Sequence, residues 1–179
     1  MAWIGETHED RAEGTLKDAY ARIVRALGRV IPFYRAYSVS PAHLHAHLDF
    51  YERLGKLGVL SKRRKELIAV AVSAENGCRD CTQLHSGLLR AHRVDEAVVA
   101  ALAADPGPAL ADGHVAGTNA VVVAYALKLT RTPRAMTPAD VDTLRAAGLS
   151  EPEIFEVALL TGYFNYTNRI GVGLGVEPE

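Results

Sequence analysis

The chain has 179 residues, 49% of them hydrophobic and 23% charged, which is enough for one globular domain with a substantial core. Its formal net charge of -1 gives no electrostatic reason to expect nucleic acid or an anionic membrane as a partner. The acidic N-terminus lacks the pattern of a secretory signal, and no run approaches the roughly 20 apolar residues of a membrane span, so we expect a cytoplasmic protein.

Two amphipathic helices are expected near the N-terminus. The first runs from Thr15 to Leu27, where apolar residues recur at the helical spacing of three and four. The second opens at Ser40-Pro41, a cap followed by a first-turn proline, and continues to about Leu54. It carries three histidines: His43, His45 and His47. His43 and His47 share a face and could hold a metal, but no third ligand lies nearby, so we interpret the triplet as a solvated helix face.

The next helix, from about Lys62 to Ala74, is apolar and contains one internal acid, Glu66. Ser61 can cap its start. Asn76-Gly77 is expected to stop it, because glycine takes the left-handed conformation that ends a helix.

The only two cysteines, Cys78 and Cys81, follow this stop, and His85 comes one helical turn after the second. In a helix that begins near Cys78, all three side chains share a face. A thiolate is the reactive form of cysteine, and a helix N-terminus and a neighbouring imidazole both favour it. Two closely spaced cysteines without a secretory signal indicate redox or metal chemistry rather than a secreted disulfide framework.

The remaining segments also read as helical. Asp95 caps a short helix through Ala103, and residues 105–108 are expected to form a rigid turn. A helix from about Gly113 to Leu129 is apolar all round, which places it at the centre or at a subunit interface. The last two helices are expected to start at Thr137-Pro138 and at the Ser150/Glu153 capping box, the final one ending near Asn168. No strand-like alternation appears, so the predicted fold is all-α.

The pattern Glu66, eleven residues, Cys78-x-x-Cys81, three residues, His85 resembles the signature of AhpD-like alkylhydroperoxidases of the carboxymuconolactone decarboxylase family. The later run TPADVDTLRAAGLSEPEIFEVALLTGYFNYTNRIG resembles the C-terminal part of peroxidase-related members. This resemblance implies a helical bundle of about seven or eight helices in a single domain, with N-terminal helices over residues 1–54 and the core over residues 55–179. It also implies a homo-oligomer, a trimer or a hexamer.

The histidine at i+4 can reach the sulfur of Cys81, so we assign Cys81 as the thiolate that attacks a peroxide. The sulfenic acid product condenses with a nearby thiol, and Cys78 lies one turn back as the resolving thiol. The resemblance agrees with both roles and implies that Glu66 and His85 form a proton relay. It further implies no bound cofactor and an external dithiol as reductant, possibly a lipoyl group on a partner protein.

One departure from the family pattern precedes the second cysteine. Relatives often carry a histidine there, whereas this chain has Asp80, whose negative charge would disfavour the neighbouring thiolate. Other residues have two interpretations. His92 is interpreted as a surface histidine. Aromatic residues that could line a peroxide pocket, but that more simply form core, are Trp3, Tyr163, Phe164 and Tyr166. Polar residues of the last helix that could cap a neighbouring helix or meet another subunit are Asn165, Asn168 and Arg169.

Three other functions stay open. Cys78, Cys81 and His85 could bind catalytic zinc, with Glu66 or water as the fourth ligand. A lactone decarboxylase activity would fit the family name but would not need a cysteine pair. A catalytically silent oligomeric scaffold would leave peroxide consumption unchanged when Cys81 is replaced by serine.

Overall fold

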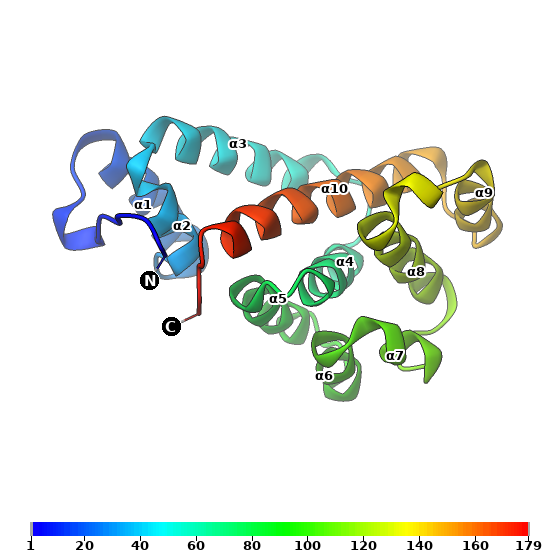
Figure 1. Cartoon of the computed structure of the whole chain (residues 1–179). Coiled ribbons are helices and arrows are strands. Elements are labelled where there is room, and N and C mark those ends of the chain that lie inside the picture. Colours follow the sequence, from blue (N-terminus) through cyan, green and yellow to red (C-terminus); the bar gives the residue numbers. More distant parts are fainter. Residues whose placement is uncertain (1, 179) are drawn as a thin grey trace. The chain divides into compact units, whose positions relative to one another are not determined.

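The structure is a computed structural model that describes residues 2–178. Within these residues it contains ten α-helices, three short 3₁₀ helices and no strand, which confirms the all-α prediction (Figure 1). Two of the helices, α2 and α7, have only five and six residues, and the other eight agree with the expected seven or eight. Among residues 2–178, no helix combines the length and apolar character needed to cross a bilayer.

The chain forms two compact units. One unit comprises the chain up to Leu57 together with the chain from Ile170 onward, and the other comprises Gly58–Arg169. The sequence-based division into N-terminal helices up to residue 54 and a core from residue 55, within a single domain, stays a prediction.

The first unit is built on α1 (Gly14–Leu27) and α3 (Pro41–Leu57), which pack against each other. The predicted apolar stripe of α1 is buried: Leu16, Ala19, Tyr20 and Ile23. Between the two helices lie α2 (Pro32–Ala36) and a 3₁₀ turn (Tyr37–Val39), which the sequence did not predict. Pro32 opens α2 because proline suits the first position of a helix, where no backbone N–H is needed.

The interpretation of the histidine triplet as a solvated face is wrong for His47. This side chain is only 5% exposed, and its ring centre lies 5.2 to 5.9 Å from the ring centres of Phe33, Tyr34 and Tyr37. Burial removes water from the charged imidazolium and lowers the pKa of His47 to about 4. His43 is exposed, with its Nδ1 2.6 Å from the hydroxyl of Ser40.

The second unit is organised around α4 (Lys62–Glu75), which contacts α5 (Arg79–Ala91), α6 (Glu96–Ala104), α7 (Pro106–Ala111) and α8 (Gly117–Arg131) (Figure 1). Every residue of α4 from 67 to 73 is buried, so this helix has no solvated face over two turns. Around it lies the core: Leu67, Val70, Ala71, Leu89, Val99, Leu102, Ala109, Val115, Val123 and Leu127. Both Val123 and Leu127 belong to α8, so one face of that helix lies in the core, while Ala124 is exposed.

Some helix limits differ from the predicted ones. Residues 106–111 form α7 rather than a rigid turn, because Asp105 caps this segment by accepting a hydrogen bond from the backbone N–H of Gly107 at 3.0 Å. The helix α8 starts at Gly117, four residues later than expected. After α9 (Pro138–Ala146), one of the two bonds of the predicted capping box is present, with Glu153 accepting from the backbone N–H of Ser150 at 2.9 Å. It opens α10 (Glu151–Gly173), which runs past the expected end.

A buried carboxylate joins α10 to the start of α4. Glu156 forms a 2.7 Å ion pair with Lys65, and these residues are only 5% and 8% exposed. The other oxygen of Glu156 accepts from the backbone N–H groups of Val59 and Leu60, at 2.6 and 2.7 Å. A Cβ atom at Gly58 would collide with this ion pair, which explains why glycine precedes the segment. The ion pair and these hydrogen bonds therefore fix α10 to the N-terminal end of α4.

Candidate redox site at the junction of α4 and α5

The turn between α4 and α5 is a Schellman motif. Gly77 has a φ of +67°, the left-handed conformation predicted for it. Its N–H donates to the carbonyl of Ala74 at 3.0 Å, and the N–H of Cys78 donates to the carbonyl of Ser73 at 2.9 Å. Cys78 thus ends this motif and is also the N-cap residue of α5.

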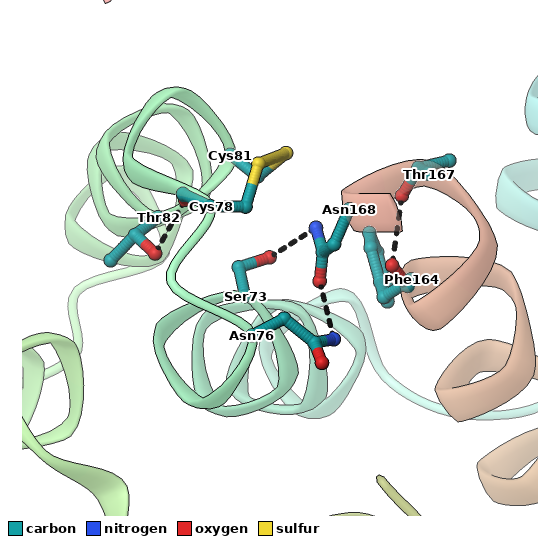
Figure 2. The surroundings of a disulfide bond; sticks show 8 residues. All are labelled: Ser73, Asn76, Cys78, Cys81, Thr82, Phe164, Thr167 and Asn168. Atoms are coloured by element: carbon teal, nitrogen blue, oxygen red, sulfur yellow. Dashed lines mark hydrogen bonds between the residues drawn. A yellow bond between two sulfur atoms is a disulfide. The ribbon is translucent and has the colours of Figure 1, made fainter. Parts of the chain in front are cut away.

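A disulfide joins Cys78 to Cys81, with the two Cα atoms 5.4 Å apart (Figure 2). Cys81 lies in the first turn of α5, where the unpaired backbone N–H groups and the helix dipole favour a negative charge. Both residues are buried, Cys78 with 2% and Cys81 with 8% of its surface exposed. The sulfur pair is therefore close enough to cycle between dithiol and disulfide, and Cys81 is its more accessible member.

Glu66 and His85 form a hydrogen-bonded pair, and His85 lies one helical turn after Cys81 in α5. Glu66 projects from α4 and His85 from α5, and the distance from the Glu66 carboxylate to Nδ1 of His85 is 2.7 Å. The ring of Phe164, from α10, packs edge-on against His85 with the ring centres 4.9 Å apart. With Glu66 ionised, His85 donates its Nδ1 proton to it, which leaves Nε2 as the basic nitrogen of the ring. This arrangement can orient an imidazole and move protons.

A polar network from α10 lies next to the disulfide, and its specific contacts could not be derived from the sequence. Figure 2 shows the amide of Asn168 directed toward Ser73 and Asn76. Its nitrogen donates to the hydroxyl of Ser73 and its oxygen accepts from the amide of Asn76, both at 3.1 Å. Asn76 also donates to the side chain of Asn165 at 3.1 Å. Asn76 is the C-cap residue of α4, but the two asparagines of α10 bond side chains at this end rather than its terminal carbonyl groups, so the expected helix capping stays a prediction.

The other residues singled out from the sequence have different surroundings. Asp80 is buried in the first turn of α5, where a carboxylate suits the helix dipole even though its charge opposes a thiolate at Cys81. Tyr163 is buried like Phe164, whereas Tyr166 is exposed and Trp3 is 80% exposed. His92 is the half-buried C-cap residue of α5.

A zinc site would need at least three converging ligands. Over residues 2–178, no group of three or more His, Cys, Asp or Glu side chains is arranged as a metal site. The two sulfurs are bonded to each other, and His85 is directed with one nitrogen to Glu66.

Comparisons with known proteins show which family the chain resembles. The model of the carboxymuconolactone decarboxylase family matches residues 41–128, which contain Glu66, both cysteines and His85. A crystal structure of an uncharacterized peroxidase-related protein from Silicibacter sp. TM1040 is 28% identical, with a TM-score of 0.81, covering 91% of this chain and 84% of that one. No functionally curated protein matches the sequence.

Two further structures share the fold at lower identity. One is an uncharacterized peroxidase-related protein from Ralstonia eutropha JMP134, described as an alkylhydroperoxidase AhpD core, with 21% identity, a TM-score of 0.87, and coverage of 99% and 92%. The other is the debrominase Bmp8, with 16% identity, a TM-score of 0.79, and coverage of 97% and 90%. The sequence match and the helical architecture agree, and the chain belongs to the carboxymuconolactone decarboxylase family, with the AhpD-like fold of its peroxidase-related members.

Proposed function

We propose that the protein is a thiol-dependent reductase of alkyl hydroperoxides, in which Cys78 and Cys81 cycle between dithiol and disulfide. The observation that carries the proposal is the disulfide between two buried cysteines beside a hydrogen-bonded Glu66–His85 pair. An inert structural disulfide would have no need of an oriented imidazole in the same helix. The family membership supports a peroxidase-related or decarboxylase-like activity.

In the first step, the thiolate of Cys81 attacks the terminal oxygen of the hydroperoxide, and the O–O bond breaks. The sulfur becomes a sulfenic acid, and the alkoxide leaves as an alcohol after taking one proton. Protonated His85, held by the carboxylate of Glu66, supplies this proton. Phe164 limits the freedom of the imidazole and keeps an apolar surface beside it.

In the second step, the sulfur of Cys78 attacks the sulfenic sulfur of Cys81. The disulfide forms and the hydroxyl group leaves as water, with the proton of the Cys78 thiol. An external dithiol then returns two electrons and two protons, restores both thiols and becomes a disulfide itself. A lipoyl group on a partner protein is one dithiol of this kind. We further propose that the protein acts as a cytoplasmic homo-oligomer, trimeric or hexameric.

The assignment of Cys81 as the attacking residue is supported by three observations. It is the more exposed of the two cysteines, it lies within the first turn of α5, and His85 follows it by four residues on the same helix. Cys78 is more deeply buried and is attached to the turn that ends α4, as suits a resolving thiol. The carboxylate of Asp80 opposes ionisation of Cys81 and is expected to slow the first step.

The alternative functions differ in what they require of the two cysteines. A decarboxylase would not need the cysteines, and a zinc enzyme would need them unbonded. The shared fold of the debrominase means that the helical architecture alone leaves the reaction open. The disulfide favours two-electron chemistry at sulfur over both rivals.

The test is a single turnover of the reduced protein with one equivalent of tert-butyl hydroperoxide, followed by stopped-flow and intact mass spectrometry. The wild type should lose two hydrogens as the disulfide forms. Cys78→Ser should gain one oxygen at Cys81 and stop there, whereas Cys81→Ser should not react. Equal loss of the first step in both variants would refute the roles, and tightly bound zinc with no titratable thiols would favour the metal enzyme.

A further inference from the structure

We infer that Asn168 is a positioning residue that sets the thiol–disulfide equilibrium of Cys78 and Cys81. It would do so by fixing, from α10, the turn that carries Cys78. The inference rests on the proposed redox role of the two cysteines, but not on the identity of the oxidant. Asn168 bonds Ser73 and Asn76, which lie next to the cysteine turn, so its effect on the sulfurs is indirect.

The contacts form a short chain from α10 to the resolving cysteine. Asn168 is fully buried, and its amide bonds Ser73 with one end and Asn76 with the other. Ser73 is also fully buried, and its carbonyl accepts a hydrogen bond from the backbone N–H of Cys78. Ser73 therefore connects Asn168 of α10 to Cys78. Asn76 is two residues before Cys78 and ends α4. The amide therefore bridges both sides of the Schellman motif.

This bridge has a thermodynamic consequence. A disulfide closes more favourably when its two sulfurs are already held near each other, because less conformational freedom is lost on closure. In the dithiol state the Asn168 bonds restrict the turn that carries Cys78. Removing them gives the dithiol more freedom, while the covalent bond still limits the disulfide state. The protein disulfide should then be easier to reduce.

The measurement is equilibrium with dithiothreitol. In this exchange one protein disulfide and one dithiothreitol dithiol give one protein dithiol and one oxidised dithiothreitol, with two electrons and two protons transferred. The fractions of protein in the dithiol and disulfide states are measured by thiol alkylation and mass spectrometry at set ratios of reduced to oxidised dithiothreitol. No peroxide is present, so the result does not depend on peroxidase activity.

The variants are Asn168→Leu, Ser73→Ala and the double variant. We expect each single variant to raise the equilibrium constant for reduction about tenfold, which corresponds to about 30 mV for a two-electron couple. Since both remove the same hydrogen bond, the double variant should exceed the larger single effect only slightly. Ser73→Ala removes only a hydroxyl, so it carries the test even if Asn168→Leu does not fold.

Thr161→Val is the matched control, because Thr161 is fully buried in α10 but its hydroxyl bonds Val157 within the same helix at 2.7 Å. Its equilibrium constant should equal that of the wild type. Unchanged constants in folded Ser73→Ala and Asn168→Leu would overturn the inference, as would an equal shift in Thr161→Val. If the wild type reduces no hydroperoxide but the shifts appear, the proposed function fails and the inference stands.

Discussion

Replacing Glu156 by glutamine should destabilise the protein strongly without touching the cysteine site. The carboxylate has three partners in the structure: the ammonium of Lys65 on one oxygen and two backbone N–H groups on the other. Glutamine keeps one acceptor oxygen and replaces the other by a donor. That donor must face either the ammonium or the backbone N–H groups, and in both cases two donors meet.

The magnitude follows from burial. Both members of the ion pair are at least nine-tenths buried, so the glutamine variant removes, away from water, the negative charge that lies 2.7 Å from the ammonium of Lys65. Breaking a buried ion pair in this way costs about 3 to 5 kcal/mol. For a chain of this length each kcal/mol lowers the melting temperature by about 2 to 4 °C, so we expect a decrease of about 6 to 20 °C.

Urea denaturation followed by circular dichroism measures this cost, and Glu151→Gln is the control. Glu151 pairs with Arg145 at 2.6 Å on the surface, where water and salt screen an ion pair and its contribution to stability is small. A second variant, Lys65→Met combined with Glu156→Gln, removes the lysine charge as well and should recover most of the loss. If Glu156→Gln costs no more than Glu151→Gln, the pair is hydrated in solution and the reasoning from burial is wrong.

Three further predictions concern the site and the first unit. Glu66→Gln keeps the hydrogen bond to His85 but removes its charge, so oxidation of Cys81 should slow about 100-fold with a changed pH profile in stopped-flow; an unchanged profile would remove the relay. Gly77→Ala places a side chain at a φ of +67° with no atom within 4 Å of its Cβ, so only backbone strain of about 1 to 2 kcal/mol should appear in urea denaturation. For His47, the pKa is about 4 in the folded protein and 6.5 when exposed, so the unfolded chain binds the proton first and stability falls as pH drops through that window. His47→Phe should abolish this loss of about 3 kcal/mol when urea denaturation at pH 7 is compared with pH 4.

Features with a local signal could be predicted from the sequence. Ser61 accepts from the backbone of Arg64 at the start of α4, and Gly77 ends that helix in the left-handed conformation. Both signals act within a few residues, which is why they were readable. The pairing of Glu66 with His85 joins residues nineteen positions apart, and only the family resemblance suggested it.

Features that depend on distant contacts could not be predicted. The hydrogen bond between the side chains of Asn76 and Asn168 joins residues 92 positions apart. The sequence indicates only that Asn168 is more polar than a core helix requires. His47 was interpreted as solvated because the aromatic residues that bury it lie in α2 and the adjoining 3₁₀ turn, which no periodic pattern revealed. In both cases the residue itself is evident in the sequence, but the residues that it contacts cannot be identified from its sequence neighbours.

The placement of the site on two helices determines how a redox change can be absorbed. Glu66 belongs to α4, whose residues 67–73 are all buried, and Cys78 lies in the turn that follows it, whereas Cys81 and His85 belong to α5. The disulfide links the end of α4 to the first turn of α5, and the Glu66–His85 bond links the same helices one turn further along α5. Reduction therefore removes one of these two links, and the Glu66–His85 bond still joins the two helices. In the proposed mechanism, Cys81 would then move toward a peroxide while His85 stays bonded to Glu66.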